Sequence, residues 1–115
     1  MSDKNGLNRI VGEQLSSVEF IQDYVQLHFD GACLTAITLP AVTVDGVTRR
    51  HNDSGYRDAL CVCIAKKVIA VKVDEAEIRI DFGSGRSISI SLQDKDYRGP
   101  EAAVFHDGHK PIVVF

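Results

Sequence analysis

The sequence contains no tryptophan, one methionine and few aromatic residues, which make up 7% of its 115 positions. A core with so few large rings has to be filled by aliphatic side chains, and Val and Ile favour β-strands. The chain also lacks any cluster of about five basic residues, and its formal net charge is −3. Because clustered Lys and Arg are what neutralise nucleic-acid phosphates, we expect no nucleic-acid partner.

No apolar run approaches the roughly 18 residues that a membrane-spanning helix needs. The start of the chain also lacks the apolar segment with a basic flank that a secretory signal would have. We therefore expect a cytoplasmic protein with no membrane partner. The three cysteines, Cys33, Cys61 and Cys63, lie among apolar residues. Their odd number indicates buried free thiols and argues against a disulfide framework.

The length corresponds to a single domain over residues 1–115, with residues 1–10 expected to fray. Apolar and polar residues alternate with a period of two over much of the chain, and turns such as Asp30-Gly31 separate the alternating stretches. This pattern is typical of antiparallel strands with one solvated face.

Two helices are also predicted. The main one covers about 55–67, where apolar residues recur at helical spacing, and a short one covers about 100–105, where Pro100 suits a first helical turn. The run 59–65 is largely apolar, so it is compatible with a buried strand as well as with a helix, because periodicity does not separate the two.

The stretches 18–39 and 71–92 resemble each other. The aligned apolar positions are Val25, Leu27 and Phe29 in the first stretch, and Ile78, Ile80 and Phe82 in the second. The match predicts an α+β fold of antiparallel β-meanders in two similar halves, arranged as a curled sheet or half-barrel. Two meanders rich in Val, Ile and glycine turns also align by chance, and the sequence leaves that alternative open.

A Tyr-Arg pair follows each of the two stretches, Tyr56-Arg57 after the first and Tyr97-Arg98 after the second. Tyr and Arg are enriched at interface hot spots, so these pairs, with Arg50 and His51, are the candidate binding residues. In the structural alternative, each Arg pairs with a nearby carboxylate and each Tyr holds a helix on the sheet.

His106 and His109, spaced H-x-x-H, are weaker candidates for metal ligands. Zinc needs three or four ligands, and the sequence shows no complete set, so a solvated polar turn is favoured. No Gly-x-Ser-x-Gly nucleophile motif occurs. We therefore assign no catalytic residue and no cofactor.

Two segments carry a family resemblance. SISISL…DYRGPEAAVF, within 87–105, and GYRDALCVCIAKKV, over 55–68, are similar to segments of small bacterial proteins of unknown function with a GPEA step. Some small acidic α+β proteins of this kind are immunity proteins of bacterial toxin systems. The resemblance transfers no catalytic residue and implies an interaction role.

Two functions follow as expectations. The first is a non-enzymatic protein-interaction domain, immunity-like, that binds a protein partner or forms a homodimer. The alternative is a small-ligand binding module or minor enzyme with a pocket near the Tyr-Arg loops.

Overall fold

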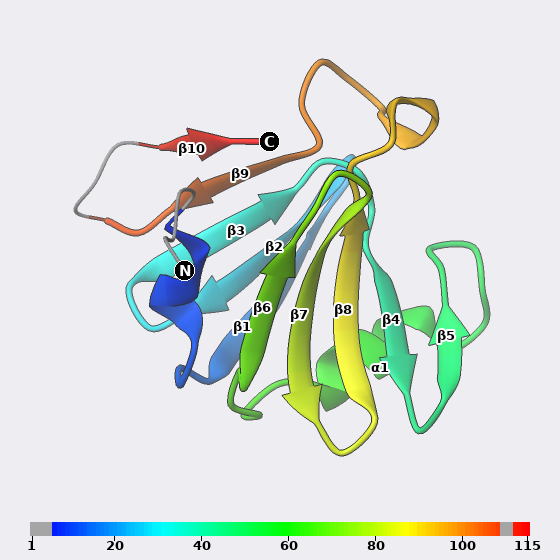
Figure 1. The fold of residues 1–115 in the computed structure, drawn as a ribbon. Coiled ribbons are helices and arrows are strands. Elements are labelled where there is room, and N and C mark those ends of the chain that lie inside the picture. The colour runs from blue at the N-terminus through cyan, green and yellow to red at the C-terminus, as the bar shows by residue number, and fades with distance from the viewer. Residues whose placement is uncertain (1–5, 109–111) are drawn as a thin grey trace.

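The computed structural model describes residues 6–108 and 112–115, which form two five-stranded antiparallel sheets, one α-helix and two short 3-10 helices (Figure 1). The first sheet contains, in spatial order, β1 (Leu15–Ile21), β2 (Tyr24–Phe29), β3 (Ala32–Ala36), β9 (Ala103–His106) and β10 (Val113–Val114). The second contains β5 (Val47–Arg49), β4 (Ala41–Val44), β8 (Arg86–Ser91), β7 (Glu77–Gly83) and β6 (Ala70–Val73). The helices are η1 (Leu7–Ile10), α1 (Tyr56–Val62) and η2 (Asp94–Asp96). The predicted α+β fold of antiparallel meanders is confirmed.

The two predicted halves are visible in the strand pairing. In one row of paired residues across the first sheet lie Val18, Leu27, Leu34, Phe105 and Val113. The matching row across the second sheet holds Val71, Ile80, Ile88, Val42 and Arg49. The equivalence of the stretches 18–39 and 71–92 is therefore structural, because each forms a three-stranded meander.

Each half keeps three strands in its own sheet and sends the next two to the other sheet. The first half forms β1–β2–β3 and then passes β4 and β5 to the second sheet, beside β8. The second half forms β6–β7–β8 and then passes β9 and β10 to the first sheet, beside β3. The result is two open sheets that exchange strands, where the sequence suggested one curled sheet or half-barrel.

The core consists of the inward-facing positions of both sheets, which form one hydrophobic cluster. Leu27, Leu34, Ile80 and Ile88 are all completely buried. The residues in the turns fix the register of the hairpins. The β4–β5 turn, for example, places Asp45 and Gly46 at φ +52° and +83°, the left-handed conformations that an Asp-Gly type I′ turn supplies.

The start of the chain is more ordered than the sequence indicated. Residues 1–10 were expected to fray, but Leu7 and Ile10 in η1 are completely buried. Residues 1–5 lie outside the described part of the chain. None of the described helices is long and apolar enough to cross a membrane.

The main helix is shorter than the predicted 55–67. α1 covers Tyr56–Val62, so the start of the ambiguous run 59–65 is helical. The helix ends because the chain joins β1 immediately afterwards. Ala65, at φ +73°, donates its backbone N–H to the Leu15 carbonyl at 2.8 Å, and the Leu15 N–H donates to the Lys66 carbonyl. Tertiary pairing thus overrides the helical pattern that continues in the sequence.

The short helix predicted at about 100–105 is wrong. Residues Ala103–His106 form β9, inserted between β3 and β10. The segment alternates between buried Ala103 and Phe105 and the more exposed Val104 and His106, which is a strand pattern of period two. Pro100 precedes this strand and does not begin a helix.

Candidate functional site

The chain passes from one sheet to the other at two connections, both at the top of Figure 1. The first crossover, 37–40, links β3 to β4, and the second, 92–102, links β8 to β9. They are tied together, because the backbone N–H groups of Ile37 and Thr38 both donate to the Ala102 carbonyl at 2.9 Å. The second crossover contains η2 and is much longer than the first, although the two occupy equivalent places in the repeat.

Beside these connections is a cleft of about 810 Å³, which we call the crossover cleft. This volume is in the usual range for small-molecule sites, about 300–1,000 Å³. Its lining consists of Thr38, Leu39, Ala41, Arg50, His51, Ala76, Glu77, Ser89, Ser91, Gln93, Lys95, Asp96, Tyr97 and Arg98. Ser89 and Ser91 alternate along β8 with the buried Ile88 and Ile90, so the cleft lies on the outer face of the second sheet.

Four of the six predicted binding residues meet in this cleft. Arg50 and His51 reach it from the loop after β5, and Tyr97 and Arg98 from the second crossover. The other two, Tyr56 and Arg57, do not line it. The two Tyr-Arg pairs are therefore not equivalent: the first begins α1 after β5, whereas the second precedes β9.

Tyr56 and Arg57 instead contact other parts of this chain, and in the described residues Arg57 does not form the ion pair with a carboxylate that the structural alternative expected. Tyr56 is 6% exposed and its hydroxyl donates to the Pro40 carbonyl at 2.6 Å. This hydrogen bond connects the start of α1 to the first crossover. Burial raises the pKa of Tyr56 to about 12. The Arg57 guanidinium lies 5.5 Å from the centre of the Phe20 ring, a cation–π distance that holds α1 against β1.

The crossover cleft carries more positive than negative charge. Its cationic residues are Arg50, Lys95 and Arg98, and its acids are Glu77 and Asp96. Asp96 accepts a hydrogen bond from the Ser91 hydroxyl. Among the described residues the only ion pairs are Arg9–Glu13 and His28–Glu19, so none of the three cleft cations forms an ion pair there.

Thr38 adds an unusual group to the cleft lining. The residue is 4% exposed, and its hydroxyl oxygen is buried with no hydrogen-bond partner in the described structure. A buried hydroxyl normally has a partner, because leaving it without one costs about 1–3 kcal/mol. Sequence reasoning missed Thr38, since it stands in an alternating strand pattern, and it missed Lys95 and Glu77, which belong to no motif.

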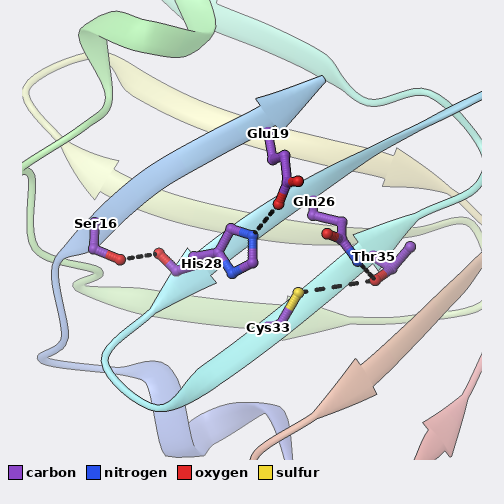
Figure 2. A network of polar contacts seen from close by, with 6 residues as sticks. All are labelled: Ser16, Glu19, Gln26, His28, Cys33 and Thr35. Atoms are coloured by element: carbon purple, nitrogen blue, oxygen red, sulfur yellow. Dashed lines mark hydrogen bonds and ion pairs between the residues drawn. The ribbon is translucent and has the colours of Figure 1, made fainter. Parts of the chain in front are cut away.

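A second polar region covers the outer face of the first sheet (Figure 2). Strand register places Ser17, His28, Cys33 and His106 in one row across four strands, and a shallow cleft of about 860 Å³ lies over them. His28 Nε2 lies 2.9 Å from the Glu19 carboxylate, and Cys33 Sγ lies 3.8 Å from the Thr35 hydroxyl oxygen; Figure 2 shows both contacts as dashed lines.

This second region does not have the features of a thiol active site. Burial raises the pKa of the Cys33 thiol, and the hydrogen bond with Thr35 offsets only part of that effect. The thiol therefore remains protonated near neutral pH and is a weak nucleophile. All three cysteines are free thiols, but only Cys63 is buried as predicted, since Cys33 is half-buried and Cys61 is exposed.

Only one residue of the predicted histidine pair lies in the described part of the chain. His106 is exposed on β9, and His109 lies outside the described residues. In 6–108 and 112–115, no three His, Cys, Asp or Glu side chains are grouped so that they could hold a metal ion.

No family model, curated protein or solved structure matches this chain.

Proposed function

We propose that this protein is a non-enzymatic binding module that holds a small anionic molecule in the crossover cleft. The observation that carries the proposal is the gathering of Arg50, Lys95 and Arg98 around one concave site, each without an ion-pair partner in the described chain. Two of these residues are arginines, whose planar guanidinium groups bind carboxylates and phosphates through paired hydrogen bonds.

The form of the repeat also supports this site. The first crossover connects the two sheets with four residues, 37–40, while the equivalent connection at 92–102 uses eleven. The extra residues are not required to bridge the sheets, and this longer segment supplies Lys95, Tyr97 and Arg98 to the cleft. Loops held by a rigid scaffold are where binding residues concentrate.

A binding role is favoured over thiol chemistry because no cysteine lines the crossover cleft. Cys33 and Cys63 do not line the crossover cleft, and burial raises the pKa of both thiols. The proposal retains two expectations from the charge and hydropathy patterns, a cytoplasmic location and no nucleic-acid partner.

Replacing both arginines, as Arg50→Gln with Arg98→Gln, is expected to weaken anion binding by about 150-fold or more. Each hydrogen bond to a charged group contributes about 1.5–3 kcal/mol. The measurement is isothermal titration of the protein with phosphate and carboxylate compounds at low ionic strength, where charge interactions are least screened.

Lys72→Gln on β6 is the matched control, because Lys72 is exposed and does not line the cleft. It should bind the same anions within about twofold of the unaltered protein, because it leaves all three cationic residues of the cleft in place. Equal loss of binding in the control and the double variant, or no anion binding by the unaltered protein, would contradict the proposal.

A second candidate function is protein interaction, including the immunity-like role. It is favoured by apolar side chains on strands at the ends of the described sheets: Val47 on β5 is 50% exposed and Val114 on β10 is 53% exposed. Edge strands offer unpaired backbone groups to another chain. Light scattering after size exclusion tests the homodimer form of this idea, which a monomer at all concentrations would eliminate.

A further inference from the structure

We infer that Asp96 is a positioning residue of the crossover cleft: its carboxylate, bonded to the Ser91 hydroxyl, fixes the segment that presents the cations of the second crossover. Those cations are Lys95 and Arg98. The inference rests on the proposed function, and it explains why a cleft that binds an anion contains an acidic side chain beside its cations. It follows from the hydrogen bonds that attach the second crossover to the sheet.

The Ser91 hydroxyl is the point at which the second crossover is attached to β8. Ser91 is the last residue of that strand and pairs with Glu77 of β7, so the strand pairing fixes its backbone. Its hydroxyl donates to Asp96 Oδ2 at 2.5 Å and accepts the Gln93 N–H at 3.2 Å. A short bond from a hydroxyl to an ionised carboxylate is stronger than a bond between neutral groups. The Asp96 side chain is therefore held at the end of β8.

The middle of the second crossover has no other polar attachment. In the described chain, the two bonds of this hydroxyl are the only hydrogen bonds or ion pairs that join residues 93–101 to either sheet. Within the segment, the Asp96 N–H donates to the Gln93 carbonyl at 2.9 Å, which closes the turn of η2 around Lys95. Arg98 follows two residues after Asp96. The place of both cations therefore depends on how Asp96 is held.

The charge of Asp96 itself opposes anion binding. Like charges a few ångströms apart in water repel each other enough to weaken binding by about two- to fivefold. Asp96 forms no ion pair in the described chain, so pairing with a cation does not account for its place in the cleft. Its only side-chain hydrogen bond there is the one with Ser91. We conclude that Asp96 serves the cleft as a hydrogen-bond acceptor and not as a charge.

Two substitutions at Asp96 separate the acceptor from the charge. Asp96→Asn keeps an oxygen that accepts the Ser91 hydrogen bond, so it should bind inorganic phosphate and citrate about two- to fivefold more tightly than the unaltered protein. Asp96→Ala removes the charge and the acceptor together. It should bind about fivefold more weakly, because the cations of an unattached segment have to be ordered when the anion binds. Isothermal titration at low ionic strength measures both affinities.

Substitutions at Ser91 test the same hydrogen bond from its other side. Ser91→Ala should weaken anion binding about fivefold although it changes no charge, and Ser91→Thr, which keeps the hydroxyl, should retain most of the affinity. In the Ser91→Ala background, Asp96→Ala should tighten binding about two- to fivefold, because only the repulsive charge is left to remove. A direct contact between Ser91 and the anion would not reverse the sign of the Asp96→Ala effect.

Asp94 provides the matched control. It is an exposed acid of η2 that neither lines the cleft nor forms a side-chain hydrogen bond in the described chain, so Asp94→Ala should bind within about twofold of the unaltered protein. Thermal unfolding tests whether the substitutions damage the fold. Because the bond between Ser91 and Asp96 is exposed to solvent, all of these variants should unfold within about 4 °C of the unaltered protein.

The outcomes distinguish this inference from the proposed function. If Asp96→Ala binds as tightly as Asp96→Asn, or if both bind equally weakly, the hydrogen bond does not position the cations, and the inference is overturned while the anion site stands. Weaker binding together with a fall of more than about 4 °C in unfolding temperature would indicate a structural role and would also overturn it. If neither inorganic phosphate nor citrate binds to the folded, unaltered protein, the proposed function and the inference both fail.

Discussion

Phe105→Ala is expected to lower the free energy of unfolding by about 3–5 kcal/mol, the usual cost of truncating a large buried aromatic ring. Phe105 is 2% exposed and lies in the exchanged strand β9, paired with Leu34 on one side and Val113 on the other. Its loss would leave a cavity in the row that joins the second half of the chain to the first sheet. Urea unfolding followed by circular dichroism measures the change.

Val114→Ala provides the matched control for this core substitution. Val114 lies on the adjacent strand β10 and is 53% exposed, so its truncation should cost no more than about 0.5 kcal/mol. If β9 did not pair with β3, Phe105 would be no more important than Val114, and similar costs for the two variants would contradict the strand exchange.

Alkaline solution is expected to destabilise the protein in two overlapping steps, from about pH 9 to 11 and from about pH 10 to 12. Burial raises the pKa of Cys63 from 9.0 to about 11 and that of Tyr56 from 10.0 to about 12. In each interval the unfolded chain has released a proton that the folded protein still holds, so stability falls as pH rises. Each group accounts for about 2–3 kcal/mol, which is present in full below its unfolded pKa.

Tyr56→Phe should remove most of the decline between pH 10 and 12, and Cys63→Ala most of the decline between pH 9 and 11. At pH 7, Tyr56→Phe should still cost about 1–3 kcal/mol, because the Pro40 carbonyl loses its hydrogen bond with the Tyr56 hydroxyl. Urea midpoints measured under reducing conditions from pH 7 to 12 test both effects. An alkaline profile that neither substitution changes would show that other groups cause the decline.

The sequence allowed the strands within each half to be predicted, but not the exchange between the halves. Alternation of apolar residues defines local meanders such as β6–β7–β8, because the side-chain period reports which face is buried. Whether a strand such as β4 continues its own sheet or joins the other sheet depends on long-range strand pairing. The period of apolar residues does not show which strands will pair. The same limitation explains β9, where Pro100 and a short apolar run favoured a helix until pairing with β3 decided the outcome.

The candidate site was partly predictable for a related reason. Arg50, His51, Tyr97 and Arg98 stood out by residue type, and the fold brings them into one cleft. Tyr56 and Arg57 have the same composition but do not line the cleft, because Tyr56 is bonded to the Pro40 carbonyl and Arg57 lies over the Phe20 ring. Thr38 could not be found in advance, because its significance is a missing hydrogen bond, which only three-dimensional structure reveals.

The exchange of strands between the sheets also has a consequence for how the chain acquires its fold. The inner strand β3 is completed only by β9, which lies about 70 residues later, so much of the first sheet depends on contacts that are remote in sequence. High contact order of this kind slows folding, because a long loop must close before its contacts stabilise anything. During synthesis, the first half would therefore leave the ribosome with β3 still unpaired on one side. Its final structure forms only after nearly the whole chain has been made.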